Sequence, residues 1–115
     1  MPNNPHRSAR TAALATAQDP AFLPTAAVEY RLYVGDQAPD TVAVLVALVS
    51  RYVEGATCLY GEGLWHGASE PCVCISVVAP ASAWQDILYL AGDIKVVCGQ
   101  TAILVTRTPC SQWLV

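Results

Sequence analysis

Residues 28 to 34, VEYRLYV, alternate between apolar and polar positions. This period of two is typical of a β-strand with one face in a core and one face outside it. The face suited to a core carries Val28, Tyr30, Leu32 and Val34. The opposite face carries Glu29, Arg31 and Tyr33. The pattern therefore predicts a half-buried strand.

After the loop GDQAPD the apolar residues follow a helical period, with positions 45, 48, 49 and 52 on one face. Asp40 is placed to cap a helix that begins at Thr41, and Gly55 is placed to end it. The many valines lower helix propensity, so we expect packing against the rest of the fold to keep this segment helical.

Two further strands are predicted at residues 56 to 65 and 70 to 79, and we expect them to pair as an antiparallel hairpin. In the second strand one face carries Val73, Ile75 and Val77. The other face carries Cys72, Cys74, Ser76 and Val78. The first set is suited to the same core as the strand at 28 to 34.

A second helix is predicted from Ser82, as the capping residue, to a stop at Gly99. Its expected apolar face consists of Trp84, Ile87, Leu88, Ala91 and Ile94. The segment TAILVTR, 101 to 107, then predicts a last strand.

The order strand, helix, strand, strand, helix, strand predicts a ferredoxin-like α+β fold. Two right-handed crossovers would place both helices on one face of a four-stranded antiparallel sheet. The open face is expected to carry Tyr33, Cys72, Cys74, Ser76, Val78, Ala102 and Leu104. A surface this apolar is typical of an interface, so we expect self-association.

Composition divides the chain into three parts. Residues 1 to 25 are rich in Pro, Asn, Ala, Ser and Thr, which predicts a flexible arm. Residues 26 to 108 form the predicted domain, and 109 to 115 form an apolar tail that is expected to pack on a neighbouring subunit or over a cleft. A length of 115 residues is that of one domain, and 54% hydrophobic against 13% charged residues again favours self-association.

Charge and motifs exclude several classes of partner. A formal net charge of -3 without a run of Lys or Arg counts against nucleic acid, and no apolar run is long enough for a membrane helix. The first 20 residues lack the apolar stretch of a secretion signal, so we expect a cytoplasmic protein with reduced thiols at its five cysteines. Cys72 and Cys74 alone do not make a metal signature, and no cofactor is predicted.

The segment GEGLWHGASEP, 61 to 71, concentrates the unusual residues of the chain. Its glycines permit a ligand or a second chain to approach the backbone closely. Trp65, Gly67 and Glu70 form W-x-G-x-x-E, which resembles the same stretch of the trimeric CutA proteins. These proteins share their fold with the nitrogen-regulatory PII proteins, so the resemblance implies a homotrimer with small-molecule sites between subunits. Together with GATCLYGEGLW, the segment GQTAILV, 99 to 105, is also similar to small uncharacterised bacterial domains of this topology.

The sequence departs from both families. The hairpin lacks several acidic residues that follow the motif in CutA, and the long loop and the phosphate-contacting basic residues of PII have no counterparts. We therefore predict a non-enzymatic protein that binds, senses or sequesters a small molecule, with a nucleotide or another anion among the candidates. The expected ligand-binding residues are Gly61, Glu62, Gly63, Trp65, His66, Gly67, Glu70 and Arg107.

Other interpretations remain open. Trp65 also suits a hairpin anchor and His66 a solvent-exposed turn. No phosphate loop, nucleophile elbow or HExxH occurs, but a dimeric α+β barrel enzyme would use His66 as acid or base, in a pocket with Tyr30, Trp65 and Trp84. A purely structural or interaction subunit is the third possibility.

Overall fold

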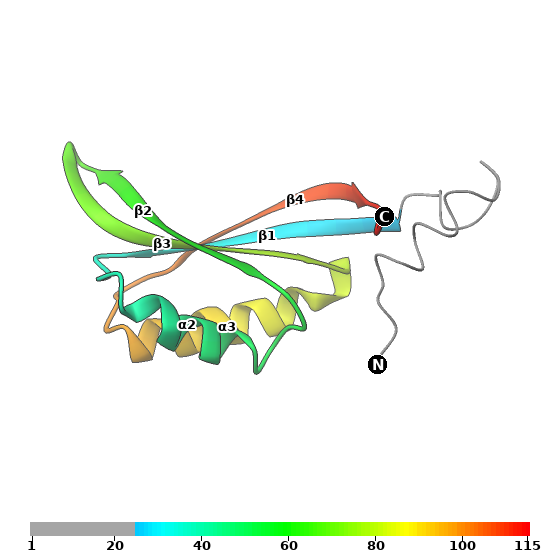
Figure 1. Cartoon of the computed structure of the whole chain (residues 1–115), viewed down its shortest axis with the longest axis horizontal. Helices are drawn as coiled ribbons and strands as arrows, with labels where there is room; N and C mark the ends of the chain where they lie inside the picture. The colour runs from blue at the N-terminus through cyan, green and yellow to red at the C-terminus, as the bar shows by residue number, and fades with distance from the viewer. Residues whose placement is uncertain (1–24) are drawn as a thin grey trace.

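The computed structural model describes residues 25 to 115, so the arm expected at residues 1 to 25 lies outside the described residues except for Thr25. The elements are β1 (Thr25–Gly35), α2 (Thr41–Val49), β2 (Thr57–Trp65), β3 (Ala68–Ala79), a short 3-10 turn (Ala81–Ala83), α3 (Trp84–Val97) and β4 (Leu104–Gln112). They form a 4-stranded sheet in the order β2-β3-β1-β4, with antiparallel neighbours throughout. Both helices cover one face of this sheet (Figure 1), which confirms the ferredoxin-like α+β prediction.

The core lies between the sheet and the two helices. The strand alternation predicts its sheet side correctly, because the buried residues are Val28, Tyr30, Leu32, Val34, Val73, Ile75 and Val77. The helices contribute Leu45, Leu48, Val49, Ile87, Leu90, Ala91 and Ile94. Removing these apolar side chains from water is the main stabilising term for so small a domain.

The start and the end of α2 differ from the prediction. Asp40 is the residue before the helix, but its side chain makes no capping hydrogen bond. Instead the hydroxyl of Thr41 donates to the carbonyl of Ala38. The helix ends at Val49, and the residues after it, 50 to 53, form hydrogen-bonded turns. Gly55 therefore lies beyond the helix and does not serve as its stop.

The start and the buried face of α3 also need correction. Ser82 lies within the 3-10 turn and does not cap the helix, which begins at Trp84 without a side-chain cap. Leu90 is buried in place of Leu88, and both Leu88 and Trp84 are about half exposed. The expected stop is confirmed, because Gly99 follows the helix with a φ of +63°.

The last strand is displaced along the chain relative to its prediction. It runs from Leu104 to Gln112 instead of 101 to 107, and it pairs with β1 over its whole length. Pro109 lies within it opposite Val28, and β4 is an edge strand, where a missing backbone N–H is tolerated. The expected boundary between domain and tail at residues 108 and 109 therefore lies inside a strand.

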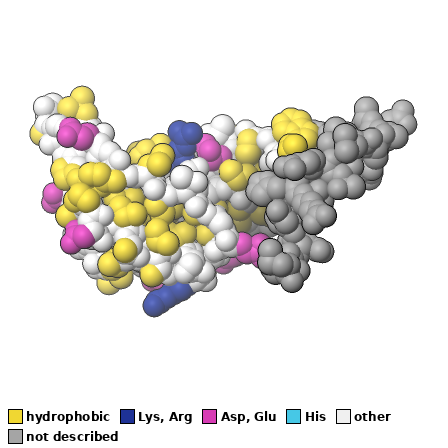
Figure 2. Space-filling model, viewed as in Figure 1, with side chains coloured by type: hydrophobic (Ala, Val, Ile, Leu, Met, Phe, Trp, Pro, Cys, Tyr) yellow, Lys and Arg dark blue, Asp and Glu magenta, His cyan; other side chains and the backbone are white. Residues whose placement is uncertain are grey.

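The hairpin of β2 and β3 bends away from the helix layer, above the open face of the sheet (Figure 1). Figure 2 shows hydrophobic side chains gathered on the visible side of the molecule, over the region of α2 and β2. Large apolar side chains are also exposed on the open face, among them Leu59 and Leu104 at 61% each. No helix within residues 25 to 115 combines the length and apolar character needed to cross a membrane.

Candidate functional site

A two-residue turn closes the hairpin of β2 and β3. Trp65 pairs with Ala68, and the two residues between them have positive φ, 48° at His66 and 79° at Gly67. Positive φ at both positions matches the type I′ turn, whose twist suits a β-hairpin. The rings of Trp65 and His66 meet edge to face, with centroids 4.8 Å apart and planes at 77°. The turn thus fixes where the Trp65 side chain leaves the strand.

A cleft of about 390 Å³ lies between this hairpin and the segment that leads into β4. It is on the open side of the sheet, because Tyr33, Cys72 and Leu104 belong to the face away from the helices. Its lining consists of Tyr33, Gly35, Gly63, Leu64, Trp65, Glu70, Cys72, Gln100, Thr101, Ala102 and Leu104. A volume of this order suits a small organic molecule.

Hydrogen bonds to the carbonyl of Gly35 hold one end of the cleft together. The amide Nε2 of Gln100 donates to this oxygen at 2.9 Å, and Nε2 of Gln37 donates to it at 3.0 Å. The backbone N–H of Gln37 also donates to the carbonyl of Pro71 at 3.2 Å. The end of β1, the start of β3 and the connection from α3 to β4 are therefore linked at this point.

Within the described part of the chain, Glu70 supplies the only charged side chain of the cleft lining. A Cβ atom at Gly35 would lie 2.5 Å from Oε1 of Glu70, so the carboxylate occupies the space that glycine leaves open. Among residues 25 to 115, no hydrogen bond or ion pair is made by this carboxylate. The cleft therefore offers one partly buried acceptor group without a partner.

The structure brings only part of the predicted site together. Gly63, Trp65 and Glu70 line the cleft. Glu62 belongs to the opposite side of the hairpin and accepts a hydrogen bond of 2.5 Å from Oγ of Ser69. Consequently Glu62 and Glu70 do not form a carboxylate pair across the hairpin. His66 and Gly67 form the turn, and Gly61 lies opposite Cys72 in the strands.

Arg107 lies on the other face of the sheet. It is opposite Tyr30 in the pairing of β1 and β4, so it faces the helix layer. There it lines a second cavity of about 340 Å³ whose other lining residues are Tyr30, Trp84, Ile87, Leu88, Val105 and Thr106. Within a single chain, Arg107 therefore does not share a cavity with the hairpin residues.

The second cavity also tests the pocket expected for a barrel enzyme. Tyr30 and Trp84 line it, and the hydroxyl of Tyr30 donates to the carbonyl of Ala81 at 3.0 Å. Trp65 and His66 lie at the far end of the hairpin and do not contribute to it. Of the four residues proposed for that pocket, Tyr30 and Trp84 therefore line this cavity, Trp65 lines the cleft, and His66 lies at the hairpin turn.

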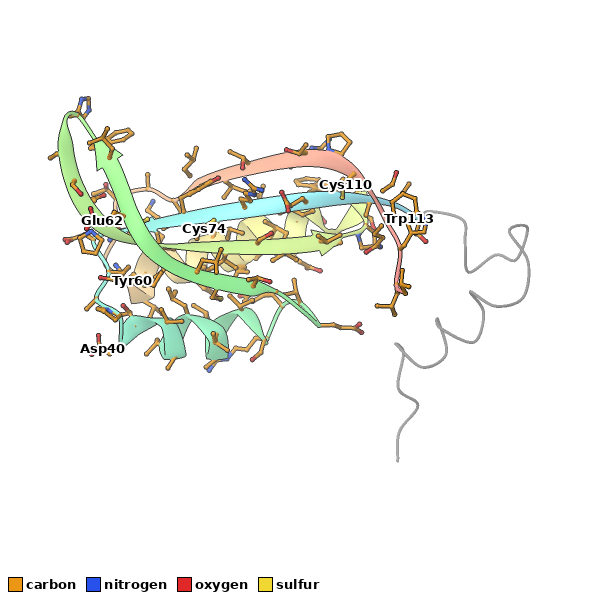
Figure 3. All side chains as sticks on the ribbon, turned by 45° about the horizontal axis from the view of Figure 1, so that its top comes forward. Asp40, Tyr60, Glu62, Cys74, Cys110 and Trp113 are labelled. Carbon is orange, nitrogen blue, oxygen red and sulfur yellow. The ribbon has the colours of Figure 1, made fainter. Side chains whose placement is uncertain are left out.

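All five cysteines are free thiols. In Figure 3 the open face is turned toward the reader, with Cys74 labelled near the middle of the sheet and Glu62 on the hairpin. Burial raises the pKa of Cys58 and of Cys74 above the ordinary thiol value, which disfavours the thiolate that metals and electrophiles require. Residues 25 to 115 contain no group of three potential metal ligands.

Sequence reasoning did not include several lining residues in the site. Tyr33 and Cys72 were expected on the open face, but nothing in the strand pattern indicates that the hairpin bends so that both line one cleft. Gln100 and Thr101 come from the segment GQTAILV, which resembles uncharacterised domains but carried no predicted site residue. Gln37, which supports the cleft, is a buried glutamine in a loop, and only its burial reveals its role.

No protein-family model matches the sequence, and no curated protein matches it. Solved structures do match. A nitrogen regulatory PII-like protein from Thiomonas intermedia K12 aligns with a TM-score of 0.56 at 11% identity, over 78% of this chain and 96% of that chain. A phage SAM lyase aligns with a TM-score of 0.60 at 16% identity, over 76% of this chain and 85% of that chain. The chain therefore has a PII/ferredoxin-like fold, whereas the likeness to CutA stays a prediction from the W-x-G-x-x-E stretch.

Proposed function

We propose that this protein binds a small molecule in the cleft beneath its hairpin and acts as a homotrimer, with the cleft near the contact between subunits. The observation that carries this proposal is the cleft itself. It joins Gly63, Trp65 and Glu70, which the sequence singles out, to Tyr33 and to the segment before β4. The PII-like protein of similar fold is described as bound to ADP, AMP and bicarbonate, which supports ligand binding on this fold.

The open sheet face supports the assembly. It exposes Leu59, Leu104 and Val78, and an apolar surface of this kind on a small domain is typical of an interface. A subunit packed there would also cover the edge of the cleft. An anionic ligand would then need a cation from outside the described part of this chain, for example from that second subunit, because no Lys or Arg of residues 25 to 115 lines the cleft.

Native mass spectrometry of the purified protein tests both parts. We expect a trimer whose mass exceeds that of three chains by one or more small molecules. Trp65→Ala should lose the added mass but keep the trimer, since this side chain contributes ring area to the cleft. A monomer or dimer would contradict the assembly, and a trimer that neither retains nor accepts any small molecule would contradict the binding role.

A lyase acting on SAM is the second candidate function. The unpaired carboxylate of Glu70 in the cleft favours it, because such a group can exchange a proton with a bound substrate, and the phage structure of similar fold is a SAM lyase. Incubation with SAM, followed by mass spectrometry of the small molecules, tests this candidate. Loss of SAM with the wild type but not with Glu70→Gln would support it, and unchanged SAM would exclude it.

A further inference from the structure

The charge of the cleft indicates the charge of its ligand. Among residues 25 to 115, Glu70 is the one charged residue of the lining, and the remaining lining residues are aromatic, aliphatic or neutral polar. We infer that the cleft selects a small organic cation, such as a quaternary ammonium group attached to an apolar body. This inference rests on the proposed binding function and specifies the chemical class of the ligand.

The Glu70 carboxylate is positioned by the backbone around it. Glu70 pairs with Gly63 in the hairpin, and its Oε1 lies over Gly35, where a side chain would displace it. The residue is only partly exposed, and its carboxylate makes no hydrogen bond or ion pair among residues 25 to 115. A carboxylate in such a place gains from a bound cation, because the cation restores the interaction that partial loss of water removes.

The walls beside this carboxylate suit a cation with little hydration. Trp65 and Tyr33 both line the cleft, and Trp65 is 69% exposed in the single chain, so its ring is available to a ligand. The face of an aromatic ring attracts an ammonium group through its negative electrostatic potential. Leu64 and Leu104 add apolar surface, which favours alkylated cations over metal ions or the ammonium ion.

An anion would meet the opposite conditions. The chain has a formal net charge of -3, and each of the cations at positions 31, 51, 95 and 107 is missing from the cleft lining. Arg31 is paired with Glu29 at 2.9 Å on the same strand, and Arg107 lies across the sheet. The electrostatic potential of the cleft within one chain therefore favours a positive ligand.

Choline and its uncharged carbon isostere, in which carbon replaces the ammonium nitrogen, differ in charge at nearly constant shape. Each is titrated into the full-length protein while the indole N–H signals are followed by NMR. The chain contains only three tryptophans, and Trp84 lines the other cavity, so its signal is an internal control. We expect choline to shift the Trp65 signal at concentrations about tenfold lower than the isostere does, and to leave Trp84 unchanged.

Two variants test the role of the carboxylate. Glu70→Gln should abolish the preference for choline, and Gly35→Ala should weaken choline binding because the added methyl group displaces Oε1. Glu54→Gln makes the same charge change at an exposed loop residue and should bind choline like the wild type. Signal dispersion in the same spectra shows whether each variant is folded.

The inference is overturned if the isostere binds as well as choline, if choline causes no shift at Trp65, or if folded Glu70→Gln keeps the preference. A shift of Trp65 by inorganic phosphate or by the isostere alone would leave the proposed binding function standing with a different class of ligand. The two proposals therefore fail in different ways.

Discussion

At the scale of single residues, the turn at the tip of the hairpin sets a backbone requirement that can be measured. Gly67 has a φ of +79°, where an added Cβ atom is strained although no atom beyond the two neighbouring residues would lie within 4 Å of it. We expect Gly67→Ala to lower the free energy of unfolding by about 1 kcal/mol, because an L-residue meets this cost in the left-handed region. Gly61→Ala, at another open position of the same hairpin but without a positive φ, should cause no loss. Equal losses in urea unfolding of the two variants would contradict this explanation.

Single residues also show how far the sequence predicts the site. Trp65, Gly63 and Glu70 are recognisable because an aromatic, a glycine and an acid are unusual together in so apolar a chain. The sequence does not reveal which face of the sheet carries Arg107, because that face depends on which residue of β1 lies opposite. The register pairs it with Tyr30, so its side chain faces the helices.

At the scale of elements, α2 depends on burial more than on its own helix propensity. Leu45 is fully buried, whereas Val44 next to it is 50% exposed. We expect Leu45→Ala to lower the free energy of unfolding by about 3 kcal/mol, since it removes core contacts and leaves a cavity. Val44→Ala should cost less than about 0.5 kcal/mol, because it loses little buried area and gains helix propensity. Chemical denaturation of both variants measures the difference, and similar losses would show that α2 does not pack as described.

The two helices are also linked by a polar contact with a pH dependence. The hydroxyl of Tyr52, just after α2, donates to Asp93 of α3, and this bond raises the pKa of Tyr52 above its ordinary value of 10.0. A raised pKa in the folded state means that the bond stabilises the protein fully below about pH 10 and that this contribution is lost as the pH rises through the folded pKa.

Ultraviolet titration checks this assignment. The wild type should show one late-ionising phenol that is missing from Tyr52→Phe, and the difference in urea midpoint between the two proteins should shrink above about pH 10. Asp93→Asn is the matched control, because it removes the charge on the acceptor and should return Tyr52 to earlier ionisation. If the phenol that disappears in Tyr52→Phe is instead one that ionises early in the wild type, the assignment is contradicted.

The ends of the elements are less predictable than their faces, for local reasons. Faces follow from alternation, so the buried sides of β1 and β3 are predicted correctly. Proline is a residue type that disfavours strands, but Pro109 is accepted in β4 because this strand is at the edge of the sheet. Ser82 and Gly55 have the residue types of helix ends, yet the backbone forms a 3-10 turn at one and ends the helix early at the other.

At the scale of the whole molecule, the apolar composition leaves more surface than one core can bury. The exposed large side chains include Leu59 and Leu104 on the open sheet face and Val96 on the helix layer. Composition predicts this surplus, but it does not predict which face another subunit covers. The proposed trimer assigns that role to the open sheet face, because a subunit there would also adjoin the cleft.

Charge placed on each face in turn tests this assignment. Leu59 lies opposite Cys74 on the open face and is 61% exposed, and Val96 on α3 is 81% exposed. Because both side chains are exposed in the single chain, a lysine at either position should leave the fold intact. We expect Leu59→Lys to convert the trimer to monomer in light scattering at micromolar concentration, because an unpaired charge would be buried at the interface. Val96→Lys should remain trimeric. If Val96→Lys dissociates instead, the helix layer and not the sheet forms the interface, and the cleft then lies away from it.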